Sequence, residues 1–98
     1  MLATRDRLLA DLRALKPEMA ARYNVKAIEL FGSFVHGEQD EASDIDLLVD
    51  FTQSADLFDL VGLGLFLEEA LQRKVDVVPR TALREELREA VISQAVPV

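Results

Sequence analysis

The sequence predicts an α/β (α+β) fold, in which a small mixed sheet of about three strands is flanked by helices within one domain, residues 1–98. Three short apolar segments, at residues 25–31, 44–51 and 74–79, have the length and residue types of strands. Segments with helical spacing of apolar residues precede, separate and follow them. The expected order is helix, strand, short helical turn, strand, helix, strand, helix.

The first predicted helix is amphipathic and is expected to pack on the sheet as a scaffold. Its apolar side chains recur at helical spacing, at Leu8, Leu9, Leu12, Leu15 and Met19. Proline is compatible only with a helix start or a kink, because it lacks the backbone donor. Pro17 therefore predicts a break near Lys16 and a second short helix over residues 17–22. Asn24 then marks a turn before the first strand.

The helix expected over about residues 55–72 is apolar nearly all round, with Ser54 as its cap and Asp56 in its first turn. Such a helix is buried on more than one side. Two alternatives stay open for the second side: a partner protein covers it, or the C-terminal helix does. Gly62 and Gly64 weaken the helix, and close approach of another backbone would explain them. The apolar side chains are Leu57, Phe58, Leu60, Val61, Leu63, Leu65, Phe66, Leu67 and Leu71; Phe51 and Phe58 are expected in the core.

The last helix follows the valine-rich third strand, and Thr81 is its expected cap. Its expected buried face consists of Leu83, Leu87, Ala90 and Val91. The tail over residues 95–98 is apolar and short, and no strand is expected there.

Composition narrows the classes of partner. The formal net charge is −7 and the sequence contains no cysteine. A nucleic-acid backbone is disfavoured as the main partner, because such binding relies on clustered Lys and Arg. Acidity suits a metal-loaded site or docking onto a basic protein. Any metal must be held by oxygen or by the single histidine. No leader or membrane-spanning run is visible in the sequence, so a cytoplasmic location is expected.

Two aspartates stand at the start of the second strand, in Asp44-Ile45-Asp46. Side chains alternate along a strand, so Asp44 and Asp46 share one face. Two adjacent carboxylates repel each other, and a cation between them would relieve the repulsion. Mg²⁺ suits such oxygen ligands and completes its shell with water and phosphate oxygens. The alternative is that both aspartates are only solvated residues beside a polar loop.

Gly32 and Ser33 follow the first strand directly. Glycine permits a tight turn and close approach of a ligand to the backbone, and the N–H groups of the following helical turn favour an anion. A triphosphate could lie on Gly32-Ser33 with its metal on the two aspartates. In the alternative reading, Ser33 is only a turn residue.

These motifs, Gly-Ser, ten residues, then Asp-x-Asp, give the chain its resemblance to a known family. The sequence resembles the minimal nucleotidyltransferases of the DNA polymerase β superfamily over nearly its whole length, including the segment Arg73-Lys74-Val75-Asp76-Val77-Val78. The resemblance implies the polymerase β-like fold and a third acidic residue at Asp76. There Asp76 would complete the metal site and could accept the proton of an attacking hydroxyl. Otherwise Asp76 belongs to an exposed strand edge.

The resemblance also implies an activity and a partner. The expected reaction is Mg²⁺-dependent transfer of AMP from ATP to a hydroxyl, with Asp44, Asp46 and Asp76 catalytic and metal-binding, and Gly32 and Ser33 nucleotide-binding. The expected acceptor is a HEPN-type ribonuclease toxin, modified on a tyrosine by this chain acting as its antitoxin. The alternatives are an idle antitoxin that masks its toxin, and a nucleotidyltransferase of small molecules.

One residue departs from the family pattern. His36 stands where family members often carry arginine, and a mostly neutral imidazole attracts phosphate less. The remaining acidic residues of this region, Glu38, Asp40, Glu41 and Asp50, are expected to be solvated charges.

Overall fold

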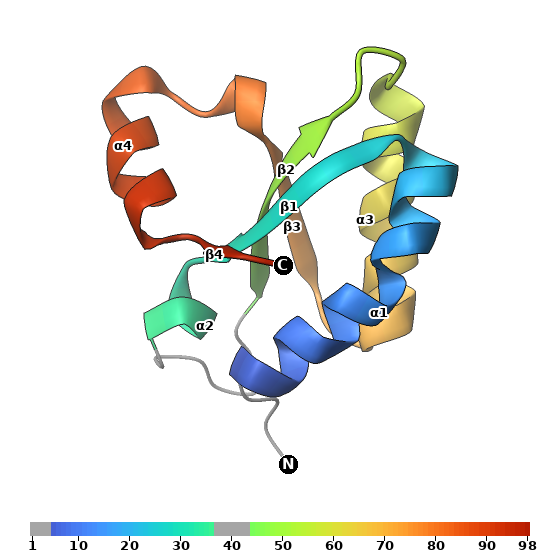
Figure 1. Ribbon diagram of the computed structural model, residues 1–98, viewed down its shortest axis with the longest axis horizontal. Helices are drawn as coiled ribbons and strands as arrows, with labels where there is room; N and C mark the ends of the chain where they lie inside the picture. The colour runs from blue at the N-terminus through green and yellow to red at the C-terminus, as the bar shows by residue number, and fades with distance from the viewer. Residues whose placement is uncertain (1–4, 37–43) are drawn as a thin grey trace.

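A computed structural model describes residues 5–36 and 44–98. A four-stranded mixed sheet, in the order β3-β2-β1-β4, forms its centre (Figure 1). The strands β1 and β2 are antiparallel, as are β1 and β4, whereas β2 and β3 are parallel. The elements in chain order are α1 (Arg5–Tyr23), β1 (Val25–Phe31), α2 (Ser33–His36), β2 (Ile45–Phe51), α3 (Leu57–Leu71), β3 (Val75–Pro79), the 3₁₀ helix η1 (Arg80–Ala82), α4 (Glu85–Gln94) and β4 (Val96–Pro97).

The two faces of the sheet have different surroundings. Ile45, Leu47 and Val49 of β2 point to one face and join a core that includes buried leucines of α1 and α3. Figure 1 shows α1 and α3 together on this side, and α4 on the other. Because side chains alternate along a strand, Asp46 and Asp50 point to the face that carries α4. On that face Leu48 is buried, whereas Asp46 and Asp50 on either side of it remain partly exposed.

The predicted mixed sheet is confirmed, with one strand more than expected. The first strand is as predicted, and the second and third begin one residue later than predicted. The missed strand is β4, whose pairs are Glu29 with Pro97 and Leu30 with Val96. The backbone N–H of Val98 also donates to the carbonyl of Ile28, at 3.0 Å. A two-residue strand is too short to show an alternating pattern, which is why the sequence did not reveal it.

The predicted break in the first helix is wrong, because α1 runs continuously through Pro17. Leu12 and Met19, on either side of this proline, are both fully buried. Their burial stabilises both halves and offsets the hydrogen bond that proline cannot make. Figure 1 shows α1 changing direction along its length, the usual response of a helix to an internal proline.

The predicted cap of the central helix is also wrong. Asp56, not Ser54, is the N-cap of α3: its Oδ1 accepts from the N–H of Asp59 at 3.0 Å. The Asp59 side chain returns a bond to the N–H of Asp56, which completes a capping box. The sequence prediction overlooked Asp59, the third residue of the helix, as the partner that completes this capping box with Asp56.

The apolar surface of α3 is only partly covered. Leu63 and Leu67 are fully buried in the core, but Phe58, which was expected in the core, is 85% exposed. The alternative in which the C-terminal helix covers α3 is wrong, because α4 lies across the sheet from it (Figure 1). Phe51 packs against the core as expected. The outer side of α3 is thus an exposed apolar surface.

The glycines of α3 face side chains rather than a second backbone. A Cβ on Gly62 would lie 2.8 Å from Cε1 of Tyr23 in α1. A Cβ on Gly64 would meet only Cγ2 of Val77, at 3.9 Å. Gly62 therefore allows the contact between α1 and α3, whereas Gly64 serves no such contact.

The expected buried face of the last helix is wrong. No residue of α4, which is described throughout, is buried, and Leu87 is 52% exposed. Thr81 lies in η1 rather than at a cap, and the N-cap Arg84 makes no side-chain cap bond. Helical spacing shows which side of a helix is apolar, but not whether another surface covers it. Among the described residues, no helix is long and apolar enough to cross a membrane.

Candidate active site

The predicted site residues meet at one edge of the sheet because of the strand directions. The parallel pairing of β2 and β3 sets Asp46 directly beside Asp76, and the antiparallel pairing of β1 and β2 sets Phe31 opposite Asp46. Paired residues on neighbouring strands point to the same face, so the Asp46 and Asp76 carboxylates project together. The bond from the N–H of Ile45 to the carbonyl of Lys74, at 2.9 Å, fixes this register.

Gly32 brings the backbone of the turn against Asp46. Its φ is +81°, a conformation that residues with a side chain rarely adopt. A Cβ at this position would lie 2.2 Å from Oδ2 of Asp46, so only glycine fits. The N–H of Val35 donates to the Gly32 carbonyl at 3.1 Å, which closes the first turn of α2. The turn therefore holds its backbone beside the carboxylate pair.

The electrostatics identify Asp46 as the central carboxylate. Partial burial raises the pKa of Asp46, and the nearby charges of Asp76 and then Asp44 raise it further. Asp44 and Asp76 are themselves exposed. The ionised form of Asp46 is therefore repelled by two neighbouring negative charges, and a bound cation would relieve this repulsion.

The sequence model of the nucleotidyltransferase domain matches residues 12–97. The chain belongs to the nucleotidyltransferase family. Its curated relatives include the protein adenylyltransferase MntA of Thermococcus cleftensis, 35% identical over 97 residues, which cover 99% of this chain and 98% of the relative.

Solved structures agree with this assignment. A minimal nucleotidyltransferase structure superposes with a TM-score of 0.84 at 37% identity, over 97% of this chain and 96% of that one. A toxin–antitoxin structure with AMP-PNP superposes with a TM-score of 0.71 at 27% identity, over 89% of this chain and 70% of that one. The predicted family, fold and enzyme class are confirmed: this chain is a nucleotidyltransferase with the minimal form of the fold.

The metal-binding capacity of the described residues rests on pairs of carboxylates. Within residues 5–36 and 44–98, no group of three or more His, Cys, Asp or Glu side chains is arranged to hold a metal ion. Charges influence one another over longer distances than metal–ligand bonds, so this finding agrees with the raised pKa of Asp46. The residues present still fit Mg²⁺, which usually takes one or two carboxylates and completes its shell with phosphate and water oxygens.

The other predicted residues have definite places. Ser33 is the first residue of α2, directly after Gly32, and His36 is the last. Asp50 lies near the far end of β2 and is only partly exposed. The acidic residues Glu38, Asp40 and Glu41 lie outside the described residues. The structure thus brings Gly32, Asp46 and Asp76 together with Asp44 two residues away, while the roles of these residues stay predictions.

Two features beside the site were missed by the sequence reasoning. The guanidinium of Arg73, just before β3, stacks over the ring of Phe34 in α2, with 5.2 Å between its carbon and the ring centroid. The pair Arg73-Lys74 in front of a strand was a visible signal for a cation at this edge. A small cavity of about 170 Å³ also adjoins Gly32, lined by Phe31, Gly32, Ala90, Val91 and Gln94. No local pattern could have placed α4 there.

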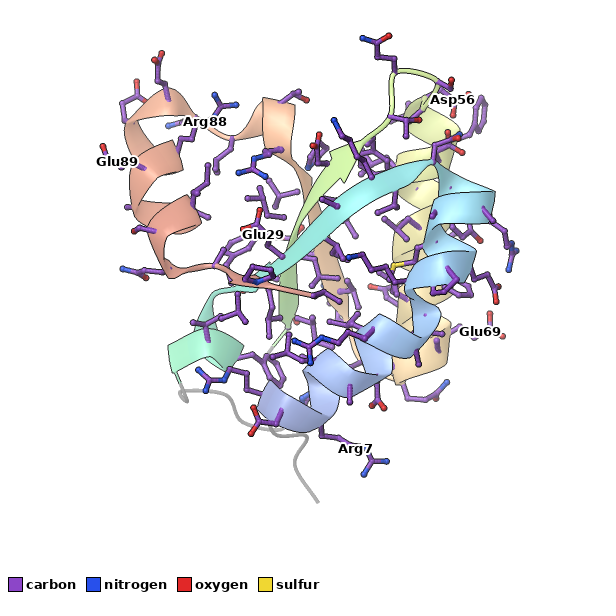
Figure 2. The ribbon with its side chains drawn as sticks, in the orientation of Figure 1. Arg7, Glu29, Asp56, Glu69, Arg88 and Glu89 are labelled. Carbon is purple, nitrogen blue, oxygen red and sulfur yellow. The ribbon has the colours of Figure 1, made fainter. Side chains whose placement is uncertain are left out.

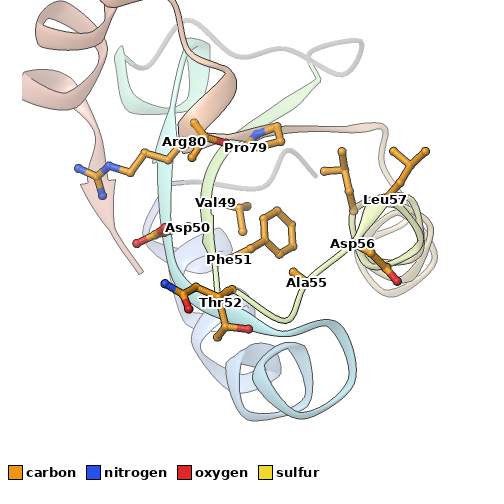
Figure 3. A pocket seen from close by; sticks show the side chains of 12 residues that line it. Val49, Asp50, Phe51, Thr52, Ala55, Asp56, Leu57, Pro79 and Arg80 are labelled. Carbon is orange, nitrogen blue, oxygen red and sulfur yellow. The ribbon is translucent and has the colours of Figure 1, made fainter.

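A larger cavity lies at the opposite end of the sheet from the carboxylates. Its volume is about 520 Å³, and Figure 3 shows Val49 and Phe51 of β2 and Leu57 of α3 around it. The side chains of Asp50 and Arg80 point away from Phe51 in this view. Arg80 forms an ion pair with Glu29 on β1, at 3.0 Å. This cavity is remote from the acidic site and contributes nothing to its chemistry.

Proposed function

We propose that this nucleotidyltransferase is the antitoxin of a toxin–antitoxin pair and transfers AMP from ATP to a tyrosine hydroxyl of a HEPN-type toxin. The observation that carries the proposal is the register of Asp46 with Asp76, beside a glycine turn that only glycine can form. The protein adenylyltransferase activity of the MntA relative supports the reaction type. The toxin–antitoxin structure with AMP-PNP supports a toxin partner and an adenine nucleotide.

The proposed reaction is one displacement at phosphorus. The acceptor oxygen forms a bond to the α-phosphorus of ATP, the bond from that phosphorus to the bridging oxygen breaks, and pyrophosphate leaves with the bonding electrons. Asp76 is exposed and accepts the proton that the hydroxyl loses. The backbone N–H groups after Gly32 hold the phosphates.

The metal requirement is part of the proposal. Mg²⁺ on Asp44 and Asp46 would supply charge neutralisation on the phosphates. Asp46 ionises less readily than an ordinary aspartate, because burial and two carboxylates raise its pKa. We therefore expect both binding of the triphosphate and transfer to require a divalent cation. Since ATP is the proposed substrate, the proposed site of action is the cytoplasm.

The test is co-expression of this chain with the product of the neighbouring gene, followed by intact-mass measurement of that product. We expect an added mass of one or more AMP units. Replacing both Asp44 and Asp46 with Asn should remove the added mass and the protection of the cells. Asp50→Asn is the matched control, because it makes the same chemical change on the same face of β2, away from the site.

A masking antitoxin is the second candidate, and the exposed apolar surface of α3 favours it. A masking protein would protect cells after both aspartates are replaced, and its partner would be bound but unmodified. Transfer to a small molecule is a third candidate. Labelled ATP with an aminoglycoside acceptor tests it, because a labelled product would form without any protein partner.

A further inference from the structure

The outer side of α3 carries a continuous apolar stripe. Leu57, Phe58, Val61 and Leu65 are exposed by 71%, 85%, 53% and 63%. Residues at positions i, i+4 and i+8 lie on one side of a helix, so Leu57, Val61 and Leu65 follow one another along it. Exposed apolar side chains are normal when scattered singly, but a row of them marks an interaction surface.

Two hollows continue this stripe into a groove. A cavity of about 220 Å³ lies between α3 and β3 and is lined by Leu60, Val61, Gly64, Leu65, Glu68, Val75 and Val77. The 520 Å³ cavity at the other end of α3 shares Leu60 and adds Leu57 and Phe51 (Figure 3). Because β3 is an edge strand, no further strand borders this side of the groove in the described sheet. The groove therefore runs along the helix and is wide enough for side chains from a partner.

The charged residues of α3 and its N-cap are all acidic, whereas the nearby Arg80, which lines the larger cavity, is paired with Glu29 on β1. The α3 sequence and its N-cap contain Asp56, Asp59, Glu68 and Glu69, and no Lys or Arg. Figure 2 shows Asp56 and Glu69 near opposite ends of the helix. Two copies packed through α3 would place acidic ends together in either direction, so a second copy is disfavoured. A complementary surface must be apolar along its centre and basic along its edges.

We propose that the α3 groove is the docking site for a protein partner that presents a helix with an apolar stripe flanked by Lys or Arg. This inference rests on the proposed function, and the partner it identifies is the toxin. Helix-in-groove binding matches the elongated shape of the surface. The groove and the Asp46 carboxylate lie on opposite faces of the sheet, so docking leaves the catalytic edge open for an acceptor side chain.

The test measures binding of this chain to the product of the neighbouring gene by calorimetry, using Leu65→Glu and Phe58→Ser as groove variants. Both residues are exposed, so the core is kept intact, and thermal melting verifies the fold. We expect Leu65→Glu to weaken binding at least about tenfold. The matched control is Leu87→Glu, the same change at an exposed leucine of α4, which should stay within about twofold of the unaltered chain.

Each outcome decides the proposal. Equal affinity of the Leu65→Glu and unaltered chains would overturn it, as would no binding by the unaltered chain. Dimerisation of the chain alone that Leu65→Glu abolishes would assign the groove to a second copy instead. If the groove variants lose binding but no AMP is transferred by any variant, docking stands and the proposed transfer fails. If AMP is transferred equally well by the groove variants, the transfer stands and docking fails.

Discussion

At the scale of single residues, Gly32 is the position where one methyl group should matter most. Gly32→Ala would place Cβ 2.2 Å from Oδ2 of Asp46 on a backbone with φ of +81°. We expect a loss of about 1 to 3 kcal/mol in the free energy of unfolding and loss of AMP transfer. Urea unfolding and the intact-mass assay measure these effects, and normal transfer by the folded variant would contradict the proposed role of the turn.

The raised pKa of Asp46 makes the stability of the protein depend on pH. The folded state holds this proton more tightly than the unfolded state, whose pKa is near 3.8, so ionisation of Asp46 lowers stability as pH rises through the folded pKa. Asp46→Asn should therefore stabilise the metal-free protein at neutral pH and have no such effect near pH 3. The gain should be below about 1 kcal/mol, because the carboxyl is partly exposed and solvent screens it.

Thermal unfolding with and without Mg²⁺ completes this test. The proposed Mg²⁺ site exists only in the folded state, so Mg²⁺ should raise the Tm of the unaltered protein and change that of Asp46→Asn little. Asp50→Asn serves again as the control and should respond to Mg²⁺ like the unaltered protein. A Tm that responds to Mg²⁺ equally in all three would show that the ion binds elsewhere.

At the scale of elements, the two glycines of α3 offer an internal comparison. Gly64→Ala should stabilise the protein by about 0.5 to 1 kcal/mol, because alanine favours the helix and its Cβ meets only Val77, at 3.9 Å. Gly62→Ala should destabilise it, since the new Cβ would lie 2.8 Å from a Tyr23 ring that also packs against Phe66. Chemical denaturation measures both, and equal effects would mean that Tyr23 moves freely.

Some features of the helices and strands were predictable from the sequence and others were not. The strands and the Gly-Ser turn were predictable, because alternation and turn chemistry are local properties. The expected cover of α3 by the last helix, the buried face of α4 and the core position of Phe58 were wrong for a shared reason. Apolar spacing reports a preference for burial, whereas the surface that satisfies it depends on distant parts of the chain. Continuity through Pro17 likewise came from core packing around Leu12 and Met19.

At the scale of the whole molecule, the acidic edge and the α3 groove are separate surfaces. Distant sites without shared contacts usually act independently. Leu65→Glu should therefore leave the affinity for AMP-PNP with Mg²⁺ within about twofold of the unaltered chain, whereas Asp46→Asn should abolish measurable binding. Calorimetry of the two single variants checks this, and a strong effect of Leu65→Glu on nucleotide affinity would show that the surfaces communicate.

The candidate site, like the fold, was only partly predictable from the sequence. The spacing of Gly32 and Asp46 indicates the chemistry, and the family resemblance predicts a third acidic residue, Asp76, beside them. The raised pKa of Asp46 and the stacking of Arg73 on Phe34 depend on distances across strands, which a linear pattern does not contain.

The parallel pairing of β2 with β3 also determines when the parts of the site can assemble during translation. The hairpin of β1 and β2 can form once residue 51 has emerged, but Asp76 arrives only after the whole crossover through α3 has been made. A nascent chain that ends before β3 carries the turn and two aspartates without their partner. Asp76 is thus synthesised last of the three carboxylates, and α3, which carries the apolar groove, is complete before it.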